Sequence, residues 1–208
     1  IATKFPNHIY IFTDASKTSE HCAAASFNSS NNDSKQIKLF PFTDILAAEE
    51  LAIFFALHYC IQNPSLSSAN ILIISDSQSA LKEICWPLFK HTKNTIILRI
   101  RNFLQHLSVT QQSQILFLWV PGHIGIPGNE TVDLLAKDTS RDSPTFPYIR
   151  YSDVLQDIKF ETNILWQKLY KQTINKKSTY FEIQPSLPTR PWYSQFSYIR
   201  RHPLVVIS

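Results

Sequence analysis

Four acidic residues, spread widely along the chain, are its strongest candidates for chemistry: Asp14, Glu49, Asp76 and Asp133. Carboxylates brought close together repel one another, and their pKa values rise unless a cation neutralises them. Their oxygen atoms suit Mg²⁺ or Mn²⁺ better than zinc. A pair of such ions roughly 3.5–4 Å apart can activate a water and stabilise the leaving oxygen in phosphodiester cleavage. This chemistry is available if the fold gathers the four acids.

Each acid also has a simpler structural interpretation. Asp14 and Asp76 could cap the elements that follow them. Glu49 and Glu50 are expected in the first turn of a helix, where the helix dipole favours negative charge. Asp133, on a helix, would ordinarily face solvent. Taken one at a time the structural interpretation is favoured, so a site is indicated only if the fold brings the acids together.

His123 is a further candidate because its loop has an unusual composition. All three glycines of the chain fall within residues 122–128, between Pro121 and the helix that follows. Glycine adopts backbone angles that other residues avoid, so this segment is a shaped loop. A histidine held there beside acids could shuttle a proton for the departing product. Alone, His123 could equally be structural.

The elements that must position these residues follow from hydrophobic periodicity. Strands are predicted over His8–Thr13, Ala23–Phe27, Ile37–Phe42, Asn70–Ser75 and Gln114–Val120. Helices are predicted from Ile45 until Pro64 stops the pattern, and over Ser77–Cys85, Ile96–Leu107, Glu130–Asp138 and Ser152–Lys171.

This order predicts an α/β fold with a mixed five-stranded sheet, three antiparallel strands and then parallel strands, flanked by helices. Asn70–Ser75 is continuously apolar, as expected of a parallel strand covered on both faces. In such sheets ligands bind outside the carboxyl ends of the strands. Asp14 and Asp76 directly follow two predicted strands, so both are expected at that edge.

Composition limits the class of protein. The 208 residues, 44% hydrophobic, suffice for one domain with an appendage. No apolar run approaches the roughly 18–20 residues that cross a membrane, and no signal peptide is evident. Three widely spaced cysteines predict neither disulfides nor a zinc site and favour a reducing intracellular compartment, the cytoplasm or nucleus. Because the chain contains no Met, we interpret it as an internal segment of a longer reading frame.

A change in composition divides the chain into residues 5–141 and residues 142–208. Residues 1–141 contain 11 Lys/Arg and 11 Asp/Glu, whereas residues 142–208 contain 9 and 5, so the net charge of +4 arises in the second part. We expect this part to be a linker and a mostly helical or irregular tail. Its basic character suits a polyanionic partner, although any single lysine is more simply a solvated side chain.

Four segments, in order and at characteristic spacings, carry a resemblance to a known family. They are Phe12–Ser16, Ala48–Ile53, Ser75–Leu81, and Trp119–His123 continuing through Asn129 and Glu130 to Asp133. Together they resemble the ribonuclease H domains of non-LTR retrotransposon reverse transcriptases, over residues 8 to about 140. The tail is similar to the segment that follows the nuclease in those elements.

The resemblance implies a type 1 ribonuclease H, an endonuclease that hydrolyses the RNA strand of an RNA–DNA hybrid with two Mg²⁺ ions, for which Mn²⁺ can substitute. It implies that His123 assists product release and that Glu49 rather than Glu50 binds metal. It also implies a reverse transcriptase covalently linked in the parent polyprotein. The metal ligands that it implies are Asp14, Glu49, Asp76 and Asp133.

The chain departs from the family at Ala15 and at Cys22–Ala25, where the family favours glycine. Added methyl groups there could hinder the hybrid, which leaves a catalytically impaired nucleic-acid-binding remnant as the alternative. A third hypothesis is an integrase or resolvase. The loop of residues 121–128 and the spacing of the acids disfavour it. Candidate contacts to the nucleic-acid backbone, which could equally be solvated, are Lys82, Lys90, His91, Lys93, Arg99 and Arg101.

Overall fold

The computed structural model describes residues 3–85, 94–139, 145–173 and 186. These residues fall into two compact units, Ile1–Val154 and Leu155–Ser208. Residues 145–154, expected in the linker, therefore pack within the first unit. The candidate contacts Lys90, His91 and Lys93, and the tail beyond residue 173 apart from residue 186, lie outside the described residues.

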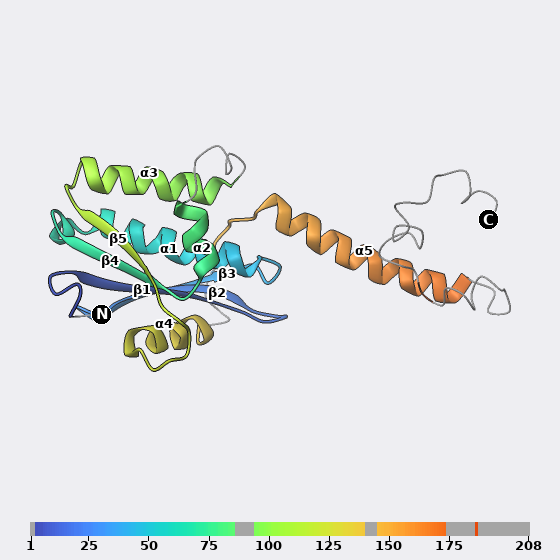
Figure 1. Ribbon diagram of the computed structural model, residues 1–208. Coiled ribbons are helices and arrows are strands. Elements are labelled where there is room, and N and C mark those ends of the chain that lie inside the picture. Colours follow the sequence, from blue (N-terminus) through green and yellow to red (C-terminus); the bar gives the residue numbers. More distant parts are fainter. Residues whose placement is uncertain (1–2, 86–93, 140–144, 174–185, 187–208) are drawn as a thin grey trace, which may run out of the picture. The chain divides into compact units, whose positions relative to one another are not determined.

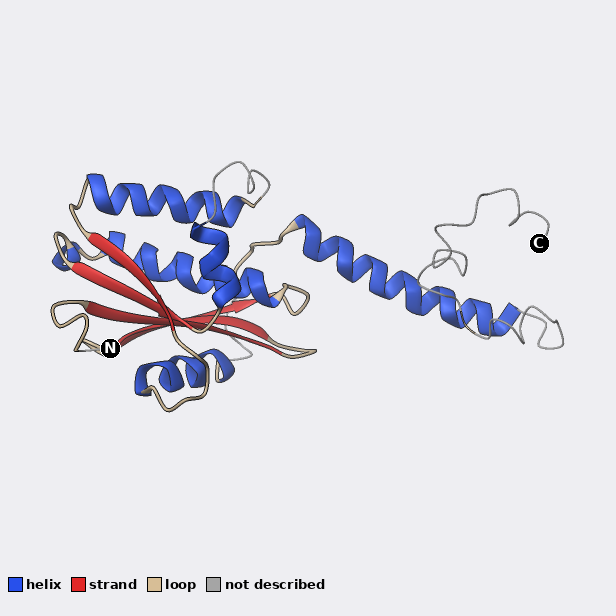
Figure 2. Cartoon of the chain, viewed as in Figure 1, coloured by secondary structure: helices blue, strands red, loops and turns tan. Residues whose placement is uncertain are grey.

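The first unit is built on one five-stranded sheet, shown in Figures 1 and 2. Its order is β3-β2-β1-β4-β5; β2 pairs antiparallel with β1 and β3, and β4 pairs parallel with β1 and β5. The predicted mixed sheet is therefore confirmed. The strands are β1 (Ile9–Lys17), β2 (Cys22–Asn28), β3 (Asp33–Leu39), β4 (Asn70–Ser75) and β5 (Gln114–Trp119).

Helices cover both faces of this sheet. In Figure 2, α1, α2 and α3 lie on one side and α4 lies alone on the other. A short 3₁₀ turn, Pro64–Leu66, follows α1, and α5 begins in the first unit and continues into the second. The helices are α1 (Ile45–Gln62), α2 (Gln78–Cys85), α3 (Thr95–Val109), α4 (Pro127–Lys137) and α5 (Tyr151–Thr173).

The central strand β4 explains why its sequence is apolar without interruption. Ile71 and Ile73 belong to the core cluster under α1 and α3, whereas Leu72 and Ile74 belong to the cluster under α4. Successive side chains of a strand point to opposite faces, so a strand buried on both faces needs an apolar residue at every position. The prediction of a doubly covered parallel strand is confirmed.

Helix α1 is the most buried helix of the described chain. By length and composition alone it could cross a membrane, so the expectation that no segment is long and apolar enough was wrong. Glu49 and Glu50 are the only Asp, Glu, Lys or Arg residues of this helix, and they interrupt its apolar pattern in the sequence. Most of the helix is buried inside the first unit, in the core cluster with β1, β4 and α3. The apolar composition of α1 is therefore accounted for by packing in the core.

The start of one strand and the place of one acid in its helix differ from those predicted. Strand β3 begins at Asp33 rather than Ile37, because this edge strand starts with polar residues that carry no apolar signal. Helix α1 begins at Ile45 as predicted, but Glu49 lies beyond its first turn and not within it, so the helix dipole is not the reason for this acid. In both cases local sequence preference does not explain the residues found there, so the explanation lies in tertiary contacts.

Candidate active site

The parallel pairing of β1 with β4 brings two of the predicted acids to one edge of the sheet. Thr13 pairs with Ser75 at the end of that ladder, so Asp14 and Asp76 are the next residues on neighbouring strands. Strand β1 nevertheless continues to Lys17, because it goes on pairing with β2, where Asp14 faces Ala25. The acid thus follows the parallel ladder, although it does not end its strand.

Helix α1 adds a third carboxylate to this edge. Glu49 is only 7% exposed. One oxygen each of Asp14, Glu49 and Asp76 can be chosen so that all three lie within 4.8 Å of one another. We call these three residues the carboxylate cluster. An open pocket lined by Glu49, Asp76, Ser77 and Ser79 lies beside it.

The cluster is electrostatically unfavourable without a cation. Burial and then the negative charge of Asp76 raise the pKa of Asp14 to about 7, while the Ala15 N–H, 2.8 Å from Asp14 Oδ1, opposes the rise. Burial and then the charges of Asp14 and Asp76 raise the pKa of Glu49 well above its usual value. Glu49 Oε2 is buried and has no hydrogen-bond partner among the residues that the structure describes.

These features fit a divalent metal ion. A cation would neutralise the repelling carboxylates and provide the partner that the buried oxygen of Glu49 lacks. A set made only of carboxylate oxygens suits Mg²⁺ or Mn²⁺. Asp14, Glu49 and Asp76 could therefore hold such an ion together.

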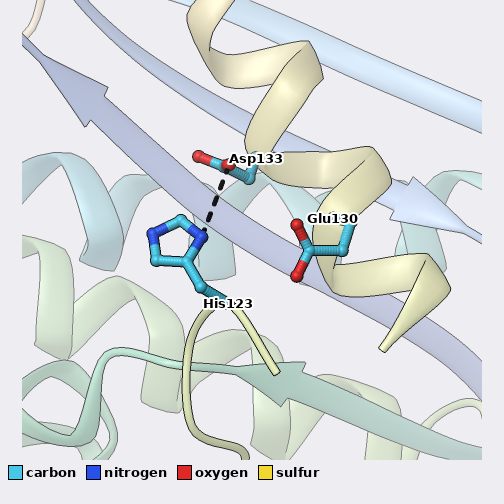
Figure 3. Close-up of side chains that lie close together, drawn as sticks. All are labelled: His123, Glu130 and Asp133. Atoms are coloured by element: carbon cyan, nitrogen blue, oxygen red, sulfur yellow. Dashed lines mark ion pairs between the residues drawn. The ribbon is translucent and has the colours of Figure 1, made fainter. Parts of the chain in front are cut away.

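Asp133 lies next to the cluster and also in a second group. It raises the pKa of Asp14 through its charge and through a side-chain hydrogen bond, which places the two residues side by side. Its other neighbours are His123 and Glu130, and ligand atoms of these three residues also lie within 4.8 Å of one another. Three of the four predicted acids thus form the cluster, and the fourth, Asp133, lies beside Asp14 of that cluster. Asp133 also faces His123, as Figure 3 shows.

The loop that carries His123, residues 121–126, is held in an unusual conformation and is called the His123 loop below. His123 has a φ of 55° and Gly125 a φ of 78°, both in the left-handed region that few residues favour. The Gly125 N–H donates to Glu130 Oε1 over 3.3 Å. The imidazole ring is directed toward Asp133 in Figure 3, and its side chain is 74% exposed.

Two contacts join this part of the chain to Asp76. Trp119 Nε1 donates to the Asp76 carbonyl oxygen over 2.9 Å. A Cβ atom at Gly122 would lie 2.8 Å from Asp76 Oδ2, so only glycine leaves that carboxylate its present place. The concentration of glycine seen in the sequence thus has a physical cause at Gly122 as well as at Gly125.

The acid Glu50 is not at the carboxylate cluster. Both of its carboxylate oxygens accept from Asn94 Nδ2 at 3.1 Å, and Oε2 lies 3.7 Å from Arg150 Nη1. Burial raises its pKa to about 7, against the opposing effects of Asn94 and Arg150. The side chains of Glu49 and Glu50 therefore lie in different surroundings, and of these two acids only Glu49 belongs to the carboxylate cluster.

Sequence reasoning missed three residues that contact the site or its supports. Lys137 Nζ lies 2.7 Å from Asp133 Oδ2, and its position four residues later on a helix was a usable signal. The acceptor role of Glu130 depends on the fold of the His123 loop. Arg150 had a local signal only for its pair with Asp153, three residues later, because its other partners, Asp44 and Glu50, are far away in the sequence.

Comparison with known proteins adds one finding. A family model described as RNase H matches residues 6–141, roughly two-thirds of the chain. The match begins ahead of β1 and ends after α4, so it includes all five strands and every residue of the carboxylate cluster together with His123 and Asp133. A comparison with curated proteins finds no match.

Proposed function

Since the chain belongs to the ribonuclease H family, whose members hydrolyse the RNA strand of RNA–DNA hybrids, we propose that it is an active, two-metal endonuclease of this kind. Divalent metal and a hybrid substrate are general to the family. The finer proposal is that Mg²⁺ is the natural ion, with Mn²⁺ as a substitute, and that two ions are held by Asp14, Glu49, Asp76 and Asp133.

One observation supports this proposal above the others: three buried or half-buried carboxylates converge at the strand edge, and one buried oxygen of Glu49 has no hydrogen-bond partner within the described part of the chain. Leaving such an arrangement without a cation would be costly, because burial and mutual repulsion act in the same direction. When bound, the metal supplies charge neutralisation, an activated water and stabilisation of the leaving oxygen. Asp14 and Asp133, which lie side by side, would share the second ion.

His123 would hold and move a proton on the product side. Its imidazole is exposed, so it can exchange protons with water, and Asp133 Oδ2 lies 4.0 Å from its Nδ1. The protonated ring is the form that can donate to a departing oxygen. The left-handed backbone of the His123 loop would keep the ring beside the acids.

The hybrid would be recognised by its shape, through phosphates and 2′-hydroxyl groups, with little reading of sequence. The pocket beside Glu49 and Asp76, with Ser77 and Ser79 on its wall, offers hydroxyl groups for such contacts. Of the candidate basic residues, Lys82 Nζ donates to Gln78 Oε1 and Arg101 Nη2 to the Ile84 carbonyl oxygen. Both therefore already have partners in the protein.

Burial favours an active enzyme over an impaired remnant. Cys22, Ala23, Ala24 and Ala25, which replace glycines favoured by the family, are 0–1% exposed. Cys22 and Ala24 belong to the core cluster on one face of the sheet and Ala25 to the cluster on the other, and Ala23 is equally buried, so these side chains do not present methyl groups to a hybrid at the surface. Only Ala15, which is half-buried, remains as a candidate obstruction.

Cleavage of a labelled RNA–DNA hybrid tests the activity. We expect Mg²⁺- or Mn²⁺-dependent cleavage of the RNA strand by the unaltered chain and none by Asp76→Asn, which retains the shape of the side chain. Hybrid binding without cleavage by the unaltered chain would replace the enzyme by the nucleic-acid-binding remnant. An Ala15→Gly variant that restores cleavage would then identify the obstruction.

We further propose that the chain is part of a retrotransposon polyprotein, with residues 5–141 as the nuclease, residues 142–208 as linker and tail, and a covalently linked reverse transcriptase. The ordered motifs from Phe12 to Asp133 support this origin. The genomic sequence upstream of the codon for Ile1 tests it. An upstream reading frame without reverse transcriptase motifs would reject the origin and leave the nuclease assignment intact.

A further inference from the structure

Residues 145–154 lie beyond the family match and yet contribute to the packing of the nuclease. The Phe146 N–H donates to the Lys38 carbonyl oxygen over 2.8 Å, and the Phe146 ring packs edge-on against Phe55 with centroids 4.9 Å apart. Tyr148 Oη lies 2.9 Å from Thr95 Oγ1 on α3. This segment is thus attached to β3, α1 and α3.

At the end of this segment, one guanidinium group contacts three carboxylates. Arg150 Nη2 lies 3.1 Å from Asp44 Oδ2, Nη1 lies 3.7 Å from Glu50 Oε2, and Nε donates to Asp153 Oδ1 over 3.1 Å. The planar fork of arginine can hold several carboxylates in fixed directions, which a lysine ammonium cannot. We call Asp44, Glu50, Arg150 and Asp153 the Arg150 clasp.

The clasp holds the residue from which α1 starts. Asp44 precedes Ile45, and its side chain makes no capping hydrogen bond to the helix. Its carboxylate is instead bound by Arg150, and its N–H donates to Asp153 Oδ2 over 3.2 Å. Its carbonyl oxygen accepts the Ala48 N–H at 3.0 Å, one residue before Glu49. The first turn of α1 is therefore attached to the clasp through both backbone and side chain.

The clasp also holds the residue that follows Glu49. The Glu50 carboxylate is fully buried and lies between Asn94 and Arg150. Glu49, by contrast, has a buried oxygen with no partner in the described chain, so nothing attached to that oxygen fixes where it points. A hydrogen bond from the Ala15 backbone also reaches the Glu49 carboxylate. The rest of the direction of this side chain comes from the helix backbone, which the clasp holds at Asp44 and Glu50, on either side of Glu49.

We propose that Arg150 is a positioning residue for Glu49, which acts by fixing the first turns of α1 through Asp44 and Glu50. Arg150 does not touch the metal. It sets the direction from which Glu49 reaches the metal, as partners that orient a metal ligand do elsewhere. This inference rests on the proposed function only in taking Glu49 as a metal ligand.

Calorimetric titration of the full chain with Mg²⁺, without nucleic acid, tests the role directly. Three variants are compared with the parent chain: Arg150→Met, the double variant Arg150→Met/Glu50→Gln, and Asp44→Asn. The exposed Lys159→Met on α5 is a matched control for the loss of a cation. Thermal unfolding and circular dichroism of each variant report on stability and folding.

The double variant separates positioning from stability. Arg150→Met leaves the buried Glu50 without its counter-ion, so its Tm should fall; adding Glu50→Gln removes that charge and should restore Tm. The Asp44 carboxylate loses Arg150 in both variants and keeps only the backbone contact with Asp153, so we expect the Mg²⁺ Kd to rise about tenfold in both, the lower end of the range for partners of metal ligands. Asp44→Asn keeps a good residue ahead of the helix and should weaken Mg²⁺ binding in the same direction. Lys159→Met should change neither quantity.

The alternative outcomes can be told apart. A double variant, or Asp44→Asn, that binds Mg²⁺ as tightly as the parent would overturn the inference and reduce Arg150 to a stabilising residue. If the variants weaken Mg²⁺ binding but the parent does not cleave a hybrid, the proposed function fails and the positioning role stands. A parent chain that binds no Mg²⁺ overturns both.

Discussion

The imidazole of His123 and the carboxylate of Asp133 face each other across the gap between the His123 loop and α4, with Nδ1 and Oδ2 4.0 Å apart. This distance is long for a hydrogen bond and suits a pair that acts through charge. The pair also links the proton-carrying ring to the acid that lies beside Asp14. Loss of His123 should therefore affect proton transfer, whereas loss of Asp133 should also affect the acids that hold the metal.

Replacement of His123 by Ala should slow turnover with little effect on metal binding. General acid–base groups contribute about 10²–10⁴-fold, so we expect a decrease in kcat of at least about 100-fold. The measurement is kcat on a hybrid substrate together with calorimetric Mg²⁺ binding. Ile124→Ala, at an exposed neighbour in the same loop, is the control and should leave both unchanged. Unaltered kcat for the His123 variant would reduce that ring to a structural element.

Alanine at Gly122 should weaken metal binding, whereas alanine at Gly128 should lower the stability of the fold. The Gly122→Ala methyl group would push Asp76 Oδ2, so metal affinity should fall while Tm changes little. The Gly128→Ala methyl group would collide with the Phe12 ring in the core, where overpacking costs roughly 1–3 kcal/mol, so Tm should fall. Thermal unfolding and Mg²⁺ titration of both variants give the comparison. Equal effects of the two variants on Tm would contradict the placement of Gly122 against Asp76.

The sequence could predict the parts of the site that depend on neighbouring strands, but not the parts that depend on contacts between distant segments. Asp14 and Asp76 could be placed together because parallel strands bring their carboxyl ends to one edge. The sequence could not predict that Asp133 lies apart from the other three acids, because its position depends on how α4 packs against the opposite face of the sheet. The resemblance separated Glu49 from Glu50, but only the packing of Arg150 and Asn94 against Glu50 gives the physical reason.

The carboxylate cluster should give the metal-free protein an unusual dependence of stability on pH. The pKa of Asp14 is about 7 in the folded protein and near 3.8 when unfolded. Between these values the folded chain binds more protons, so stability should fall as pH rises from about 4 to about 7. Mg²⁺ binds the deprotonated acids, so its stabilising effect should be larger at about pH 8 than at about pH 5.5.

Differential scanning calorimetry at several pH values, with chelator and with Mg²⁺, measures this dependence. Asp14→Asn is the matched variant because amide and carboxyl groups have nearly the same shape. Its metal-free stability should lose much of the decrease between pH 4 and 7. A parent chain whose metal-free stability rises over that range would show that the cluster is not as buried or as crowded as described.

Lys137 should compete with metal for Asp133. Its ammonium group lies 2.7 Å from Asp133 Oδ2, and the hydrogen bond to that carboxylate raises the pKa of Lys137. Removing this cation in Lys137→Met frees the carboxylate, so the Mg²⁺ concentration for half-maximal cleavage should decrease. The pair is solvent-exposed, so Tm should hardly change. A higher Mg²⁺ requirement in Lys137→Met would mean that the lysine orients Asp133 for the metal.

The Arg150 clasp also has a consequence for the order in which the protein is made. Asp44 and Arg150 are 106 residues apart in the chain, and Asp44 and Asp153 are 109 apart. A ribosome delivers every acid of the metal centre before it delivers the residues that hold the start of α1. Contacts between such distant residues close late, since the loop between them must be ordered first. The nascent nuclease would therefore contain all its acids for a time before the start of α1 is held in place, and residues 145–154 would complete it.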